Sequence, residues 1–279
     1  MDAYINTAVK VARQAGVMLL RQANHLSGLH VEHKSFNDYV TQADKTSEAI
    51  LVDGLLRAFP NHKIHTEESG IHGDKNSHYE WIIDPLDGTT NYLHHHSQYA
   101  ISIALKVKNQ LQEAVIYSPE KNDLYTATRG QGAYLNDRRL RVSKRQNLEE
   151  SLIATGFPVV DHSIVDLYLM VLKKVMAHTA GARREGAASL DLCAVASGLY
   201  EGFFEFNLKP WDIAAGALIV SEAGGLVTDM EGENTWLDTG NIVAGNPKAV
   251  AALLRFIKDA RNSRYCLLYT SSEPTRLGM

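Results

Sequence analysis

The stretch WIIDPLDGTTNY, residues 81–92, leads an apolar run directly into two carboxylates. The run YEWIID, residues 79–84, is too apolar to face water on either side, so it predicts a central strand of a sheet. Asp84 ends this strand, and Asp87 follows the kink that Pro85 imposes. A buried carboxylate is costly unless a cation compensates its charge. The stretch therefore predicts a cation site at the end of a buried strand.

The ligand atoms indicate which kind of cation this is. Asp84 and Asp87 would repel each other, and a divalent cation would reverse that repulsion. All the ligand atoms are oxygens, with the Leu86 carbonyl as one more, and no cysteine or histidine motif stands among them. Such a set favours a hard ion, Mg²⁺ or Mn²⁺, over zinc.

The DGTT segment suggests what the cation acts on. Gly88, Thr89 and Thr90 stand where a helix could begin, and Gly88 would let the backbone approach a ligand closely. A helix N-terminus beside a divalent cation is a natural site for a phosphate oxygen. The whole stretch therefore predicts phosphoryl chemistry, and the alternative for so short a motif is an acidic turn with an ordinary Asx cap.

Hydrophobic periodicity on both sides of this stretch predicts an α/β (α+β) fold. We expect helices at residues 3–23, 46–59, 165–177, 188–197, 211–225 and 247–260. Short strands are predicted in KIHTEES, GFFEF, LVTD and NIVAGN, and a mobile polar loop at residues 70–78. Five strands from Tyr99 onward, separated by turn residues, predict an antiparallel meander. Helices packed on both faces of mixed sheets are the expected architecture.

Length and composition indicate one globular body. The 279 residues are 45% hydrophobic and 22% charged, with no repeat and no clear linker. We expect a single domain over residues 1–262, built from two packed halves of roughly 1–145 and 146–262. Residues 263–279 lose the pattern of the rest and are expected to form a disordered tail.

Charge and cysteine content narrow the class of protein. The net charge of −4 and a pI near 6.3 give no global basic field for nucleic acid or an anionic membrane. Apolar stretches are interrupted before membrane-spanning length, so no membrane association is expected. Cys193 and Cys266 lie far apart, which favours a reduced, cytoplasmic protein without a disulfide framework.

Two long motifs in this order resemble a known family. WIIDPLDGTTNYLH and WDIAAGALIVSEAGG are similar to the two signatures of the inositol monophosphatases. HTEES and DYVTQAD resemble the family's other acidic segments, and ARREGAASLDL with GNIVAGNP resembles the bacterial SuhB type. The resemblance covers roughly residues 1–260. It implies a layered α-β-α-β-α sandwich of the inositol monophosphatase and fructose-bisphosphatase type, usually dimeric and sensitive to lithium.

The resemblance also implies an activity and its residues. The activity would be Mg²⁺-dependent hydrolysis of myo-inositol monophosphates and similar polyol phosphates, by direct attack of metal-activated water. Two or three metal ions would be held by Glu67, Asp84, the Leu86 carbonyl, Asp87 and Asp212. The attacking water would be oriented by Glu67, Thr89 and Asp44. The substrate would contact Gly88, Thr89, Thr90, Ala188, Glu205 and Asp212.

Without the resemblance, several of these residues have a structural interpretation as well. Asp44 could cap a helix that begins near Thr46. Glu205 could face outward from a strand, and Asp212 could complement a helix dipole. Periodicity alone does not decide whether Glu67 or Glu68 is the functional acid.

The chain departs from the family pattern at two places. Ala187 stands where the family usually has threonine or serine, so a hydroxyl near the substrate is missing and the substrate preference is open. Three histidines, His94–His96, replace a basic residue and proline after the first motif. Consecutive side chains point in different directions, so a solvated loop is expected there rather than a metal site.

Two other functions compete with the polyol phosphatase. A bisphosphatase of the same fold, acting on fructose 1,6-bisphosphate or 3′-phosphoadenosine 5′-phosphate, needs a basic cluster, for which Arg183 and Arg184 are the candidates. The SuhB resemblance also implies a non-enzymatic role in ribosomal RNA transcription antitermination, with RNA polymerase and antitermination proteins as partners. The same two arginines are the candidate partner surface for that role.

Overall fold

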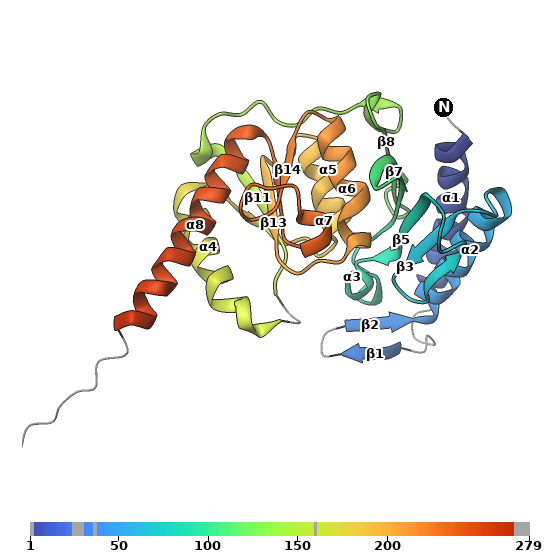
Figure 1. Cartoon of the computed structure of the whole chain (residues 1–279), viewed down its shortest axis with the longest axis horizontal. Coiled ribbons are helices and arrows are strands. Elements are labelled where there is room, and N and C mark those ends of the chain that lie inside the picture. The colour runs from blue at the N-terminus through green and yellow to red at the C-terminus, as the bar shows by residue number, and fades with distance from the viewer. Residues whose placement is uncertain (1–2, 24–30, 36–37, 159–160, 271–279) are drawn as a thin grey trace, which may run out of the picture.

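The computed structural model describes residues 3–23, 31–35, 38–158 and 161–270 (Figure 1). Two large sheets and three layers of helices form the α-β-α-β-α sandwich that the family resemblance implies. A small hairpin of β1 (Val31–Ser35) and β2 (Asp38–Thr41) lies outside the two sheets. Among the described residues, every helix is too short or too polar to cross a bilayer.

The first sheet has eight strands in the order β10-β9-β8-β7-β6-β5-β3-β4. Their bounds are β3 Lys63–Thr66, β4 Gly70–Gly73, β5 Tyr79–Asp87, β6 Ala100–Val107, β7 Gln110–Ser118, β8 Asp123–Thr128, β9 Gly132–Leu135 and β10 Arg138–Arg139. From β5 to β10 each strand pairs antiparallel with the next, which confirms the predicted meander. The last predicted strand, RLRVS, is wrong beyond Arg139, because β10 is only Arg138–Arg139. β3 pairs parallel with β5, so the sheet is mixed.

One face of this sheet is covered by α1 (Ala3–Ala23) and α2 (Gln42–Ala58). The apolar stripe of α1 is buried against α2 and the sheet, as its period predicts. α2 begins with a capping box. The Thr41 side chain accepts a bond from the backbone of the first turn, and the Asp44 side chain accepts a bond from the Thr41 N–H. The helix therefore begins four residues before the predicted start at Thr46.

The second sheet has five strands in the order β12-β11-β13-β15-β14. Their bounds are β11 Leu152–Thr155, β12 Gly181–Arg183, β13 Gly202–Glu205, β14 Leu226–Thr228 and β15 Ile242–Gly245. Its outer face packs on α4 (Val165–His178) and α8 (Pro247–Thr270). Short α7 (Trp236–Thr239) precedes β15.

Helices α5 (Ala188–Ala196) and α6 (Pro210–Glu222) form the middle layer between the two sheets. Successive strand residues face opposite layers, which shows how the layers are built. In β5, Ile82 joins the middle core and Ile83 the core with α1 and α2. In β13, Phe203 joins the middle core and Phe204 the core with α4 and α8. Both strands are thus apolar on two faces because helices cover both.

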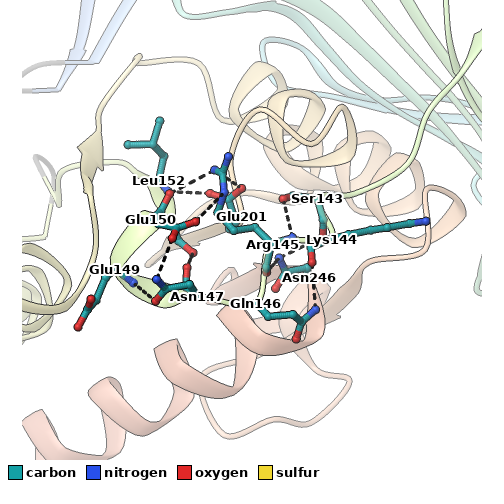
Figure 2. Close-up of polar contacts among 11 residues, drawn as sticks. Ser143, Lys144, Arg145, Gln146, Asn147, Glu149, Glu150, Leu152, Glu201 and Asn246 are labelled. Atoms are coloured by element: carbon teal, nitrogen blue, oxygen red, sulfur yellow. Dashed lines mark hydrogen bonds and ion pairs between the residues drawn. The ribbon is translucent and has the colours of Figure 1, made fainter.

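The connection between the two sheets is fixed by a buried carboxylate (Figure 2). The Glu201 side chain is fully buried, accepts a bond from the Leu152 N–H at 2.7 Å and lies 3.0 Å from Arg145 Nη1. The Asn246 side chain donates to the carbonyls of Ser143 and Arg145, each at 3.2 Å. These contacts attach the crossover segment to the second sheet.

Two sequence predictions are corrected by the structure. Residues 70–78 are not wholly a loop, because Gly70–Gly73 forms the edge strand β4 against β3. The last helix extends to Thr270, so residues 263–270, which we assigned to a disordered tail, are helical. Residues 271–279 and the side chain of Cys266 lie outside the described residues, and Cys193 is a buried free thiol.

Candidate active site

A cavity of about 260 Å³ lies where β5, β13, α5 and α6 meet. Most of the residues that the sequence singles out line it. They are Glu67, Asp87, Gly88, Thr89, Thr90, Ala188, Glu205 and Asp212, together with Arg184. The lining is completed by Gly156, Gly186, Ala187, Asp191 and Leu208. Segments far apart in the sequence therefore bring their acids to one place.

The end of β5 supplies the first group of ligand candidates. The register of β5 against β6 shifts between Asp84 and Asp87, which carries the chain out of the ladder at Pro85. Asp84 is buried, and its Oδ1 accepts a bond from the Leu86 N–H at 2.9 Å. The Ser47 hydroxyl of α2 donates to the Pro85 carbonyl at 2.7 Å. The kink is thus held from both sides.

Gly88 begins the turn that follows Asp87. Its φ of 87° lies in the left-handed region, which favours glycine. A Cβ there would lie 2.8 Å from the Gln98 carbonyl oxygen, so a side chain does not fit. The turn leads into the short helix α3 (Thr89–Leu93), whose Asn91 amide donates to the carbonyls of Gln98 at 2.7 Å and Glu185 at 2.9 Å.

Asp44 makes the capping contact that the sequence predicts and also bonds the candidate catalytic residue Thr89. Its Oδ2 accepts bonds from the Thr41 N–H at 2.8 Å and hydroxyl at 2.6 Å, which caps α2. Its Oδ1 accepts a bond from the Thr89 hydroxyl at 2.9 Å. The same hydroxyl lies 3.1 Å from the Leu86 carbonyl oxygen. Capping therefore fixes the carboxylate that orients Thr89.

The structure separates Glu67 from Glu68. Glu67 lines the cavity with Asp87 and Asp212, whereas Glu68 lines a separate pocket beside α2. The segment is anchored by the buried Glu48, which accepts a bond from the Glu68 N–H at 2.9 Å and another from the Ser69 hydroxyl. Glu67 is thus the acid that faces the other candidates.

The second half of the chain supplies Asp212 and Glu205. Asp212 caps α6 by accepting a bond from the Lys209 N–H at 2.7 Å, and it also lines the cavity. Glu205, at the end of β13, faces the cavity rather than solvent. Gly156 gives it room, because a Cβ at Gly156 would overlap the Glu205 carboxyl group.

The two halves are joined directly across the cavity. Asp87 Oδ2 accepts bonds from the Ser189 N–H at 2.8 Å and from its hydroxyl. Arg184 lines the cavity, with its guanidinium carbon 5.2 Å from the centre of the Phe157 ring. Arg183 is exposed on the edge strand β12 and does not line the cavity. Both arginines are exposed, and only Arg184 also lines the cavity.

Comparison with known proteins identifies the family. The family model described as the inositol monophosphatase family matches residues 1–263. The chain belongs to the inositol monophosphatase family. It is 62% identical to a SuhB relative from Neisseria meningitidis serogroup A over 92% of this chain and 98% of that protein. It is 48% identical to the Nus factor SuhB of Pseudomonas aeruginosa, over 92% of this chain and 97% of that protein.

Solved structures agree with the inositol monophosphatase fold. The extragenic suppressor protein SuhB of Bartonella henselae superposes with a TM-score of 0.89 at 44% identity, over 92% of this chain and 99% of that one. The Thermotoga maritima IMPase gives 0.85 at 30% identity, over 94% and 99%. Family and fold together support a phosphatase of the inositol monophosphatase type.

The acids of this family member form an electrostatically unfavourable group. Burial raises the pKa of Asp84 and of Asp212 well above the ordinary value, and the neighbouring acids raise both further. Burial also raises the pKa of Asp87 to about 6, although the Ser189 bonds oppose the shift. Within the described ranges, no three His, Cys, Asp or Glu side chains are already close enough to hold an ion. The donor set nonetheless suits hard cations, because cations would relieve the repulsion between oxygen ligands.

Sequence reasoning missed three members of this site. Asp191 lines the cavity, Ser189 binds Asp87, and Phe157 lies under Arg184. The sequence signal for Asp191 was a single acid in the otherwise apolar segment LDLCAVA, residues 190–196. The predicted solvated histidine loop is exposed at His94–His96 and lies outside the cavity lining.

Asp191 should make stability depend on pH in the metal-free protein. Burial, with help from Glu205, raises its pKa to about 9 from the ordinary 3.8. Between these values the folded protein holds a proton that the unfolded chain releases, so the free energy of unfolding falls as pH rises from about 4 to about 9. We expect Asp191→Asn to flatten this fall by up to about 1.4 kcal/mol per pH unit.

Urea unfolding in the presence of a chelator, at several pH values in that window, checks this. Asp259→Asn, which changes an acid paired with Lys174 on the surface, should keep the native slope. An unchanged slope in Asp191→Asn would show that Asp191 does not hold the proton.

Proposed function

We propose that this protein is a Mg²⁺-dependent phosphomonoesterase that hydrolyses myo-inositol monophosphates and similar polyol phosphates. The observation that carries this proposal is the cavity itself, where Glu67, Asp87 and Asp212 converge beside the Gly88 turn. The acids come from both halves of the chain, so only the completed fold assembles them. Membership of the inositol monophosphatase family supports the same reaction class.

The metal ligands would be Glu67, Asp84, the Leu86 carbonyl, Asp87 and Asp212. When bound there, two or three Mg²⁺ or Mn²⁺ ions would activate water and neutralise charge on the phosphate. Gly88, Thr89 and Thr90 would hold the phosphate by the backbone of the turn and of the first helical residues.

The Asp44–Thr89 pair supplies a path for the proton of the attacking water. Because Asp44 accepts the Thr89 proton, the Thr89 oxygen keeps a lone pair for a proton from water. The proton would pass through Thr89 Oγ1 to Asp44, and Glu67 would help to orient the water. The water oxygen would bond to phosphorus while the bond between phosphorus and the ester oxygen breaks, and the ester oxygen would take a proton from solvent water beside Asp212 and leave as the alcohol.

Phosphate release from myo-inositol 1-phosphate tests the proposal. We expect turnover with Mg²⁺, loss of turnover in a chelator, inhibition by lithium, and one solvent oxygen-18 in the product phosphate. Fructose 1,6-bisphosphate and 3′-phosphoadenosine 5′-phosphate should be poorer substrates, because Arg184 is the single cation in the described cavity lining. Absence of hydrolysis of any polyol phosphate would overturn the proposal.

Glu48→Gln should weaken metal binding although Glu48 does not line the cavity. Glu48 accepts two bonds from the segment after Glu67, and an amide has one oxygen to accept both. We expect the Mg²⁺ concentration for half-maximal activity to rise by about 10-fold or more, as for other residues that orient a ligand. A titration of activity with Mg²⁺ measures this.

Asp53→Asn is the matched control for Glu48→Gln, because Asp53 lies on the same helix in an exposed pair with Arg57. It should leave the Mg²⁺ requirement unchanged. Equal Mg²⁺ requirements in Glu48→Gln and the native protein would show that this anchor does not position Glu67.

A second candidate function is a role in transcription antitermination, proposed because the curated relatives include a protein named Nus factor SuhB. Arg183 fits such a partner surface, since it is exposed on an edge strand. Arg184 fits the active site better, since it lines the cavity. Pull-down with RNA polymerase and antitermination proteins should therefore lose the partners in Arg183→Ala, and retention there would remove Arg183 from this role.

A homodimer remains a prediction that sedimentation can test.

A further inference from the structure

Asp191 is a carboxyl group in the cavity that the proposed reaction does not use. It lies in the first turns of α5 and is 1% exposed. Its Oδ1 is buried and receives no hydrogen bond from any group in the described part of the chain. A buried acceptor without a partner is destabilising, so a hydroxyl that enters the cavity and donates to Oδ1 would bind favourably.

The position of Asp191 is fixed by the packing of its helix. Leu190 and Leu192, on either side of it, belong to the core between the two sheets. The Asp191 N–H donates to the Ala187 carbonyl at 3.0 Å, which holds the start of the helix. The carboxyl group is therefore preorganised rather than free to swing to another partner.

Asp191 shares the cavity lining with Glu205, Arg184 and Ala188. These residues belong to the second half of the chain, whereas the proposed phosphate contacts come from the turn at Gly88. Ala187 also lines this part and offers only a methyl group. A polar contact to the alcohol is therefore better supplied by Asp191 than by the residue at position 187.

We propose that Asp191 is a specificity-determining residue whose Oδ1 accepts a hydrogen bond from a hydroxyl of the substrate's alcohol group. It selects phosphate esters of polyhydroxylated alcohols over esters whose leaving group has no hydroxyl that reaches Asp191. This inference rests on the proposed phosphomonoesterase, because it assigns the alcohol side of the same cavity.

The test compares two substrates in two variants. Asp191→Leu removes the polar atoms at similar size, and Asp191→Asn keeps the Oδ1 acceptor. For myo-inositol 1-phosphate we expect kcat/KM to fall about 10- to 100-fold in Asp191→Leu, mainly through KM. For phenyl phosphate, whose leaving group has no hydroxyl, the change should stay within about threefold. Asp191→Asn should remain close to native with both esters.

Each outcome decides the inference. Equal losses with both esters, or no loss with either, would make Asp191 a structural residue and overturn the proposal. If thermal unfolding shows that Asp191→Leu is not folded, Asp191→Ala takes its place. If the native protein hydrolyses neither ester, the proposed function fails, and calorimetric binding of free myo-inositol then tests Asp191 alone. Equal affinity in native protein and variant, or no binding by the native protein, would overturn the inference.

Discussion

Asp87→Asn should lower kcat by about 1,000-fold or more while the fold persists. An amide keeps the oxygen that accepts the Ser189 bonds, so the contact between β5 and α5 survives. What it removes is one negative charge from the acids that would hold the metal. A loss of about 1,000-fold corresponds to about 4 kcal/mol of transition-state stabilisation, the size expected when one electrostatic contact to the reacting centre is removed.

The measurement is phosphate release under saturating Mg²⁺, combined with thermal unfolding. In a chelator, Asp87→Asn should be at least as stable as the native protein, because a buried carboxyl group with neighbouring acids is removed. Mg²⁺ should raise the melting temperature of the native protein and have little effect on the variant. Asp259→Asn, in a surface pair with Lys174, should behave as native in both assays. Activity within about tenfold of native would remove Asp87 from the metal site.

The apolar pattern was sufficient to predict helices on both faces of mixed sheets, whereas the five-layer arrangement was an implication of the family resemblance. Trp81–Ile83 is apolar at every position, and the structure buries both faces of that strand under different helices. The polar edge strand β4 was not predictable, because GIHG has neither an apolar alternation nor β-branched enrichment. Its pairing with β3 comes from the tertiary neighbour and not from its own sequence.

The start of α2 shows where local signals were misread. Thr41 and Asp44 form a capping box that is visible as T-x-x-D, but the prediction began the helix at the later Thr46. Asp44 was therefore weighed as either a cap or a functional acid. A carboxylate has two oxygens, and in the structure one accepts the capping bond from Thr41 and the other accepts the bond from the Thr89 hydroxyl.

The proposed alcohol side of the cavity could not be predicted from periodicity. α5 lies between two sheets and is buried on most sides, so no polar face distinguishes Asp191 from its neighbours. Phe157 and Arg184 lie in different segments and meet only in the folded chain. The motif that holds Asp87 and Thr89 was readable because its residues are consecutive.

Thr89→Ala should lower kcat by about 100- to 1,000-fold, with little change in KM. The Thr89 hydroxyl joins Asp44 Oδ1 to the place where the proposed water would stand, and alanine keeps the backbone N–H that would hold the phosphate. A lost proton path affects the transition state, whereas a lost phosphate contact would raise KM. Steady-state kinetics with myo-inositol 1-phosphate separates the two. Thr89→Ser, which keeps the hydroxyl, should stay within about tenfold of native.

A double-mutant cycle then separates the two functions of Asp44. Asp44→Asn should destabilise the protein with or without Thr89→Ala, because Thr41 loses its charged capping partner in both backgrounds. Its effect on kcat should be large when Thr89 is present and small when Thr89 is already alanine, because Thr89→Ala has by itself removed the proton path. Additive losses in kcat would show that Asp44 acts through the helix start alone, and the hydrogen bond to Thr89 would then have no part in catalysis.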